Sequence, residues 1–118
     1  MKNKKIIITG GAGYIGCHVV EELIKSNYLV TVIDRLSFDP NSLNSLKDNK
    51  NLTIINEDLR NLSNLETYLN DAEAVIHLAA LVGEAACKIS ETDTVSINYD
   101  ATIKLCDLAR KNKVKKFI

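Results

Sequence analysis

The sequence Thr9-Gly10-Gly11-Ala12-Gly13-Tyr14-Ile15-Gly16 decides the fold of this chain of 118 residues. It follows the apolar run Ile6-Ile7-Ile8 and opens an amphipathic segment that begins near Tyr14. Glycines at this spacing, between a buried strand and a helix, permit a tight turn because a Cβ atom would obstruct the turn or the packing of helix on strand. Backbone N–H groups and the positive end of the helix then face outward, in the arrangement that binds a diphosphate.

A carboxylate stands where a dinucleotide-binding unit needs one. Asp34 follows Gly16 by 18 residues and ends a second apolar run, residues 29–33. From there it can accept hydrogen bonds from the ribose hydroxyls of an adenosine. A G-x-G-x-x-G motif alone is a weak signal, but strand, turn, helix, strand and acid in this order predict dinucleotide binding. The alternative interpretation of Asp34 is a solvated aspartate at a strand end.

The composition fits one domain and excludes several classes of protein. Hydrophobic residues make up 46% of the chain, and 15 basic side chains balance 15 acidic ones, so neither nucleic acid nor a membrane surface is predicted as a partner. No apolar run approaches the roughly 20 residues of a membrane span or the roughly 7–15 of a secretory signal. Cys17, Cys87 and Cys106 lack C-x-x-C spacing and are predicted to be reduced thiols of a cytoplasmic protein.

Apolar runs alternate with helical patterns along the whole chain and predict an α/β fold. Because the runs are mostly apolar rather than alternating, we expect a parallel sheet covered by helices on both faces. Right-handed crossovers then give a doubly wound sheet of about five strands in the order 3-2-1-4-5. The expected strands are 5–9, 29–33, 52–55, 74–78 and 116–118, and the expected helices are 14–26, a weaker 42–47, 62–69 and 94–111.

The chain ends at Ile118, inside the expected fifth strand. A complete doubly wound cofactor domain usually has a sixth strand, so the sequence predicts an incomplete dinucleotide-binding domain over residues 1–118, truncated after strand five. An unfinished strand leaves a sheet edge and apolar surface uncovered. We therefore expect the chain to associate with itself.

Three further segments make a resemblance to a known family specific. They are Asp58-Leu59-Arg60 after the third expected strand, Val75-Ile76-His77-Leu78-Ala79-Ala80 along the fourth, and Asn98 with Ala101-Thr102 in the long helix. With the glycine turn and Asp34, they resemble the extended short-chain dehydrogenases/reductases, and among these the NAD-dependent epimerase/dehydratase family acting on nucleotide sugars. The resemblance covers essentially the whole chain and matches the N-terminal part of a longer family chain. It implies a Rossmann-type fold.

The resemblance implies how the first helix would meet a bound NAD. Gly10, Gly13 and Gly16 would form the phosphate turn. The backbone of Tyr14 and Ile15 would contact the diphosphate at the start of the helix.

The resemblance implies further contacts at the ends of the second, third and fourth strands. Asp34 would hold the adenosine ribose. Asp58 would accept a hydrogen bond from the adenine amino group, with Leu59 packed against the ring. The residues implied near the nicotinamide-side ribose are Leu78, Ala79, Ala80 and, close to the cofactor on the long helix, Asn98.

Several of these positions have a second interpretation. Arg35 could receive a 2′-phosphate, but Asp34 would repel that phosphate, so NAD is predicted rather than NADP. Asp58 could instead cap the helix expected near Leu62, and Asn98 could hydrogen-bond backbone at a strand end.

The two histidines do not predict a metal site. His77 lies between Ile76 and Leu78 on an apolar strand, and we expect a packed core histidine there. His18 has no H-x-x-x-H or H-E-x-x-H partner, so no metal ligand is predicted.

No catalytic residue is predicted in these 118 residues. The family's acid/base pair is a tyrosine with a lysine four residues later, and none of the four tyrosines here, Tyr14, Tyr28, Tyr68 and Tyr99, has that lysine. The resemblance therefore implies the NAD-binding portion of a nucleotide-sugar epimerase or dehydratase, which binds NAD without turnover, the nucleotide sugar being a substrate of the full-length parent. The alternatives are an NAD(P)-dependent reductase or dehydrogenase on the same scaffold, and a non-catalytic NAD(P)-sensing module.

Overall fold

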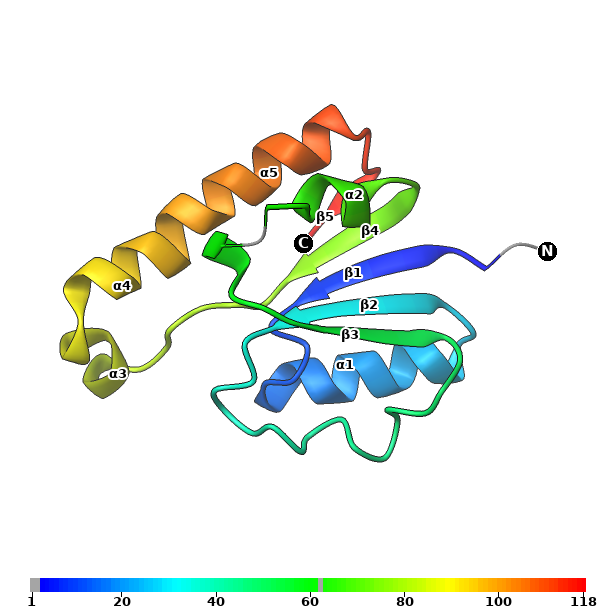
Figure 1. Cartoon of the computed structure of the whole chain (residues 1–118), viewed down its shortest axis with the longest axis horizontal. Helices are drawn as coiled ribbons and strands as arrows, with labels where there is room; N and C mark the ends of the chain where they lie inside the picture. Colours follow the sequence, from blue (N-terminus) through cyan, green and yellow to red (C-terminus); the bar gives the residue numbers. More distant parts are fainter. Residues whose placement is uncertain (1–2, 62) are drawn as a thin grey trace.

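The sheet of this protein contains five parallel strands in the order β3-β2-β1-β4-β5 (Figure 1). The structure is a computed structural model that describes residues 3–61 and 63–118. The direction of the strands and the predicted order 3-2-1-4-5 are both confirmed. The strands are β1 (Lys5–Thr9), β2 (Leu29–Asp34), β3 (Leu52–Asn56), β4 (Ala72–His77) and β5 (Lys116–Phe117).

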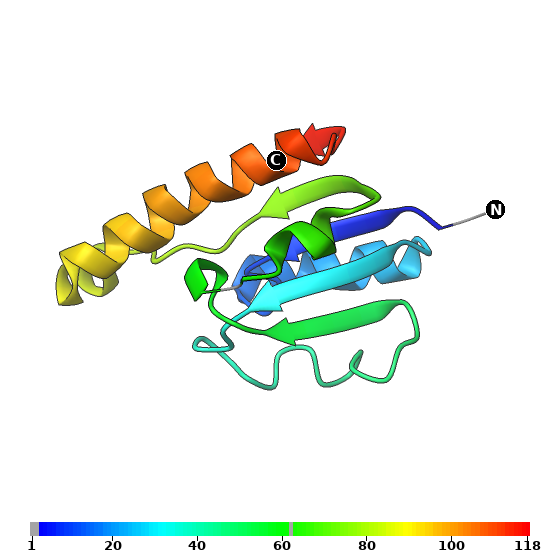
Figure 2. The ribbon, with the colours of Figure 1, turned by 45° about the horizontal axis from the view of Figure 1, so that its top comes forward.

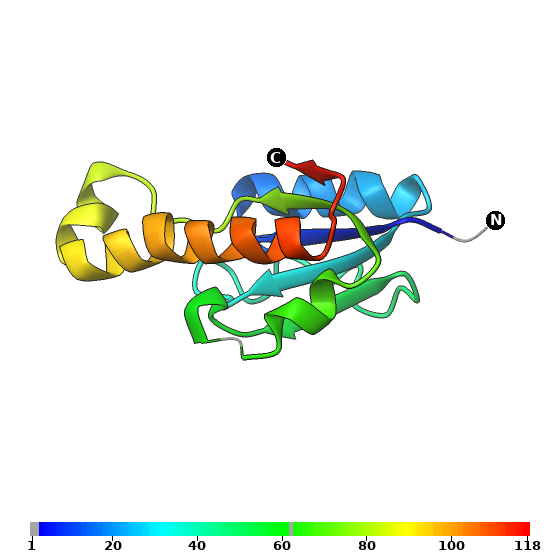
Figure 3. The ribbon, with the colours of Figure 1, turned by 90° about the horizontal axis from the view of Figure 1, so that it is seen from above.

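Helices cover both faces of the sheet, as the apolar strands predicted (Figure 3). Neighbouring residues of a strand point to opposite faces, so Ile7 and Ile8 of β1 belong to two different cores. Ile7 packs in the core shared with α2 (Leu65–Leu69) and α5 (Ala101–Lys111). Ile8 packs in the core shared with α1 (Tyr14–Lys25).

The expected helix at 94–111 is part of a longer and less regular helical segment, which Figure 2 shows as one continuous rod. It starts with α4 (Glu91–Val95), where the Ser90 hydroxyl caps the helix by accepting from the Asp93 N–H at 3.1 Å. A π-helical turn, η2 (Ser96–Asp100), then leads into α5. A short helix that the sequence analysis did not predict, α3 (Glu84–Ile89), precedes this segment.

The predicted helix at 42–47 is wrong, because residues 40–48 form a series of turns. Polar side chains in this loop satisfy the local backbone in place of a helix, as where Asp39 accepts from the Asn41 N–H at 2.8 Å. Leu43 is nevertheless buried against the α1 side of the sheet, which explains the apolar position in the pattern.

The predicted helix at 62–69 is shorter than expected. Its described part is α2, and the 3-10 turn η1 (Leu59–Asn61) lies before it. Leu62 lies outside the described residues. Within the described ranges, no helix combines the length and the apolar character needed to cross a bilayer.

Candidate functional site

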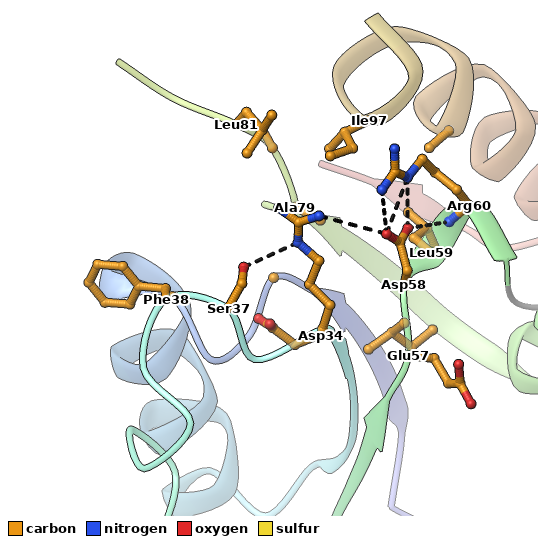
Figure 4. Close-up of a pocket in the computed structure, with 16 residues that line it drawn as sticks. Asp34, Ser37, Phe38, Glu57, Asp58, Leu59, Arg60, Ala79, Leu81 and Ile97 are labelled. Carbon is orange, nitrogen blue, oxygen red and sulfur yellow. Dashed lines mark hydrogen bonds and ion pairs between the residues drawn. The ribbon is translucent and has the colours of Figure 1, made fainter. Parts of the chain in front are cut away.

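A pocket opens where the carboxyl ends of the central strands meet the glycine turn (Figure 4). The connections that leave β1 and β4 run to opposite faces of the sheet, and ligands of doubly wound folds bind at such a point. Eight of the predicted residues line the pocket: Gly10, Gly13, Asp34, Arg35, Asp58, Leu59, Ala79 and Ala80. The predicted residues outside its lining are Tyr14, Ile15, Gly16, Leu78 and Asn98.

The glycine turn is packed against the chain that leaves β4. Gly10 has a φ of +71°, and a Cβ atom there would lie 2.7 Å from the backbone nitrogen of Ala79. A Cβ atom on Gly16 would collide with the carbonyl oxygen of Gly10. The Gly13 N–H donates to that same oxygen at 3.1 Å. The turn therefore has no room for a side chain at Gly10 or Gly16.

The first backbone N–H groups of α1 are open. Gly13 precedes the helix and supplies no side-chain cap. Within the part of the chain that the structure describes, the N–H groups of Tyr14 and Ile15 have no hydrogen-bond acceptor, and both side chains are exposed. Open N–H groups at the positive end of a helix are suited to bind an anionic group.

Asp34 joins the glycine turn to the loop after β2. Its Oδ2 accepts from the Ala12 N–H at 3.0 Å, and its Oδ1 accepts from the Leu36 N–H at 2.7 Å. Leu36 has a φ of +58°, a conformation that costs free energy in a residue with a side chain. Asp34 is thus a structural anchor as well as a pocket residue. Its two oxygens have about four acceptor sites, so two remain for ligand hydroxyls.

Asp58 follows β3, the strand next to the one that Asp34 ends, and is paired with Arg60 (Figure 4). Arg60 binds both carboxylate oxygens, with Nε 3.0 Å from Oδ1 and Nη2 2.6 Å from Oδ2. This pairing lowers the pKa of the Asp58 carboxyl. Oδ1 also accepts from the Arg60 backbone N–H at 2.9 Å, so Asp58 caps the short turn η1. The alternative from the sequence was a cap for a helix near Leu62, but the turn that Asp58 caps is η1, and α2 has no side-chain cap at Asn64.

Arg35 points its guanidinium group towards Asp58. Its Nη1 lies 3.8 Å from Asp58 Oδ2, and its Nε donates to the Ser37 hydroxyl at 3.1 Å. The Arg35 guanidinium, which lines the pocket, is therefore contacted by two groups of this chain.

Arg60 connects the exit of β3 to the helical segment across the pocket. Its Nη1 donates to Asp93 Oδ1 and to the Ser96 hydroxyl, each at 2.9 Å. Arg60 belongs to the Asp58-Leu59-Arg60 motif, but the sequence alone gave it no role. A motif shows that Arg60 adjoins Asp58, whereas only the fold brings Asp93 and Ser96 within its reach.

Asn98 reaches the site indirectly. It lies in the π-helical turn η2, and its side-chain amide pairs with both backbone groups of Leu81, which lines the pocket. The alternative prediction, that Asn98 hydrogen-bonds backbone, is therefore confirmed. π-helical turns within α-helices occur frequently at functional sites.

Several residues of the pocket were not predicted from the sequence. Most of them come from loops or from the long helical segment, and the motifs quoted from the sequence gave none of them a role at the site. The residues lining the pocket that were not predicted are Ile33, Ser37, Phe38, Glu57, Arg60, Leu81, Ile97 and Ala101.

Comparison with protein families gives one match over nearly the whole chain. The model of the NAD dependent epimerase/dehydratase family matches residues 6–118. The UDP-glucose 4-epimerase of Bacillus subtilis is 36% identical over 118 residues, which cover 96% of this chain and 35% of that protein. The chain spans about a third of the length of the curated relatives it matches first.

Solved structures give the same result. The UDP-N-acetylglucosamine 4-epimerase from Methanobrevibacter ruminantium M1, in complex with UDP-N-acetylmuramic acid, superposes with a TM-score of 0.87 at 39% identity. That match covers 99% of this chain and 37% of the other. MoeE5 in complex with UDP-glucuronic acid and NAD superposes with a TM-score of 0.80 at 30% identity, covering 96% of this chain and 35% of the other.

Proposed function

Because this chain belongs to the NAD dependent epimerase/dehydratase family, we propose that it is the NAD-binding part of a nucleotide-sugar epimerase or dehydratase. The observation that carries the proposal is the geometry of the glycine turn. A Cβ atom at Gly10 would meet the backbone of Ala79, while the N–H groups of Tyr14 and Ile15 stay open beside it. This combination of close packing and open amides fits a diphosphate at the start of α1.

The remaining residues fit the other parts of NAD. Asp34 would hold the adenosine ribose through the acceptor sites that Ala12 and Leu36 leave free. Asp58 would accept from the adenine amino group, with Leu59 against the ring. The nicotinamide-side ribose would be held along residues 78–80, with Asn98 acting through its hydrogen bonds to Leu81.

We propose NAD rather than NADP as the cofactor. A 2′-phosphate on the adenosine ribose would approach the Asp34 carboxylate and be repelled by it. The residue that could compensate is Arg35, but its guanidinium group faces Asp58 and Ser37. Asp58 would add a second negative charge near that phosphate.

We propose that this chain by itself binds NAD without turnover. In enzymes of this kind, bound NAD takes a hydride from a sugar carbon and usually returns it, while the protein orients the two reactants. The 118 residues contain no tyrosine followed four residues later by lysine. Recognition of the nucleotide sugar and proton transfer are therefore proposed for the whole protein only.

Calorimetric titration of the 118-residue chain with NAD and with NADP tests the proposal. We expect NAD to bind, NADP to bind more weakly, and Asp34→Ala to weaken NAD binding by roughly 1.5–3 kcal/mol for each hydrogen bond lost. Asp34 also holds Ala12 and Leu36, so thermal unfolding must be followed in parallel. The matched control is Asp48→Ala, an exposed aspartate in the same loop region. Absence of NAD binding by the folded wild type would refute the proposal.

A further inference from the structure

His77 is the last residue of β4, and both of its ring nitrogens are hydrogen-bonded. Nδ1 lies 2.6 Å from the hydroxyl of Thr9, and Nε2 lies 2.7 Å from the hydroxyl of Thr102. The sequence predicted a packed histidine, and the ring is in fact half-buried between β1 and α5. Burial lowers its pKa, which favours the neutral ring.

The neighbours of the two threonines determine the direction of every hydrogen bond in this group. Thr9 Oγ1 accepts from the Ala79 N–H at 3.3 Å, which leaves its own proton free to be donated to His77 Nδ1. Thr102 Oγ1 donates to the Asn98 carbonyl oxygen at 3.0 Å, so it must accept from His77 Nε2–H. Four hydrogen bonds thus run in one direction, from Ala79 to Asn98, when the proton of the neutral ring lies on Nε2.

The other neutral form breaks this chain of bonds. With the proton on Nδ1, Thr9 would accept twice, and its own hydroxyl proton would have no acceptor among its described partners. Thr102 would then donate to Nε2 and lose its bond to the Asn98 carbonyl. An unmade hydrogen bond in a half-buried site is costly, so the geometry selects the Nε2–H form.

The two ends of this chain of bonds hold the same segment of the pocket wall. At one end, Ala79 is fixed through Thr9, directly over Gly10. At the other end lies Asn98, whose side chain holds both backbone groups of Leu81. Residues 79–81 all line the pocket, so His77 joins the two points at which this wall is held.

We propose that His77, protonated on Nε2, is the positioning residue that holds residues 79–81 against the glycine turn. The wall is then ordered before a ligand arrives, and binding incurs less loss of conformational entropy. This inference rests on the proposed function, because residues 78–80 are proposed there to hold the nicotinamide-side ribose, with Asn98 acting through Leu81. The hydrogen-bond direction itself does not depend on any ligand.

The first test is the protonation state of His77 in the wild-type chain without NAD. Long-range nitrogen–proton correlation spectra of the ¹⁵N-labelled protein, recorded at neutral pH, identify which ring nitrogen carries the proton. We expect Nε2. A proton on Nδ1, or a rapid average of the two forms, would overturn the proposal even if NAD binds well.

The second test compares His77→Leu with His77→Gln by NAD titration and amide hydrogen exchange. His77→Leu removes the hydrogen bonds of both ring nitrogens. We expect NAD affinity to fall about tenfold and amide exchange at Ala79 and Leu81 to accelerate about tenfold. Exchange at Val32, in the centre of the sheet, should be unchanged, whereas global destabilisation would accelerate it too. His77→Gln has both an acceptor and a donor and should restore affinity to within about threefold of wild type.

Two further variants keep the test decisive. His18→Gln removes the other histidine of the chain, which is exposed on α1, and should leave the NAD affinity unchanged. Thr102→Val removes one hydroxyl at nearly constant shape and should accelerate amide exchange at Leu81, as expected for His77→Leu. This variant keeps the proposal testable even if His77→Leu does not fold. Wild-type NAD affinity in both folded His77→Leu and Thr102→Val would exclude the positioning role. Failure of the wild type to bind NAD would instead refute the proposed function.

Discussion

The side-chain amide of Asn98 pairs with the main chain of Leu81 through two hydrogen bonds of 2.8 Å each. Oδ1 accepts from the Leu81 N–H, and Nδ2 donates to the Leu81 carbonyl oxygen. The pairing imitates one step of a β-ladder, although Leu81 has already left the sheet. It connects the π-helical turn η2 to the wall of the pocket.

Replacing Asn98 should loosen this wall. Asn98→Ala leaves both backbone groups of Leu81 without their partner, and we expect a loss of about 1–3 kcal/mol in the free energy of unfolding together with weaker NAD binding. Urea denaturation and calorimetry measure the two effects. Asn44→Ala, at an exposed asparagine in the loop after β2, should change stability by less than about 0.5 kcal/mol. Equal effects of the two variants would contradict the role of Asn98.

Two glycines with positive φ separate backbone strain from close packing. Gly83 has a φ of +87° and no heavy atom within 4 Å of an added Cβ, whereas Gly10 has a φ of +71° and backbone atoms of Leu78 and Ala79 within 3.0 Å. Gly83→Ala should therefore cost only the strain, about 1–3 kcal/mol. Gly10→Ala should cost roughly twice as much, because overpacking adds a similar amount, and should abolish NAD binding. Thermal denaturation ranks the stabilities of the two variants. A smaller loss of stability in Gly10→Ala than in Gly83→Ala would be inconsistent with the structure.

Arg60 should matter more than its partly exposed position suggests. Arg60→Lys keeps the charge, but a single ammonium group cannot bind both Asp58 oxygens and also reach Asp93 and Ser96. We expect a loss of about 1–2 kcal/mol in the free energy of unfolding. Arg110→Lys is the matched control, because Arg110 forms an exposed 3.6 Å ion pair with Asp107, and should cost less than about 0.5 kcal/mol. Urea denaturation measures both free energies of unfolding. Equal losses would argue against a role of Arg60 in connecting Asp58 to the long helical segment.

Stability should fall as the pH is lowered below the ordinary range of histidine. Burial holds the folded-state pKa of His77 below the ordinary value of a histidine, so the unfolded chain binds the proton more readily. The contribution of His77 is thus fully present above the unfolded pKa and is lost as the pH falls through the lower folded-state pKa. Urea denaturation at several pH values between about 8 and about 5 measures this change in the free energy of unfolding.

The control for the pH dependence is His77→Gln, which does not titrate. Its stability should vary less over the same interval than that of the wild type. A second loss, at more acidic pH, should come from Asp58, because pairing with Arg60 lowers the pKa of that carboxyl and its contribution disappears as the pH falls through that pKa. A free energy of unfolding of the wild type that rose as the pH fell would contradict the expected direction of this dependence.

Self-association remains a prediction, and the long helical segment suggests where it occurs. Val95, Tyr99 and Ile103 are exposed apolar side chains at intervals of four residues along it. Exposed apolar groups of this kind are typical of interaction surfaces. Sedimentation at tens of micromolar should show a species heavier than one chain, and Ile103→Lys should shift it towards the monomer. Lys104→Gln, at the neighbouring exposed position, should leave the distribution of species unchanged. A monomeric wild type would refute the prediction.

Sequence reasoning succeeded for the fold wherever local chemistry was sufficient. The strands and the start of α1 at Tyr14 follow from apolar runs and the glycine turn, and the strand order follows from right-handed crossovers. It failed for residues 42–47, where a helical pattern competes with polar side chains that bond to nearby backbone. The short helix α3 lacks a strong apolar period and was not predicted.

For the candidate site, the sequence identified the residues next to a motif and missed those brought in from elsewhere. Asp34 and Asp58 were named because Asp34 ends β2 and Asp58 follows β3, each beside a recognisable pattern. The contact between Arg60 and Asp93 spans 33 positions in the chain, and no spacing rule predicts it. Leu81 and Ile97 belong to the pocket only because the long helical segment crosses beside the exit of β4.

The sequence by itself determined the parallel sheet and the glycine turn, since these depend on steric limits and apolar periodicity within short segments, and its motifs indicated the family by resemblance. Only the tertiary structure decided how the pocket is held together. Asp34 anchors two loops, and His77 joins Thr9 to Thr102, because hydrogen bonds between distant segments depend on distances and directions that exist only after the chain has folded.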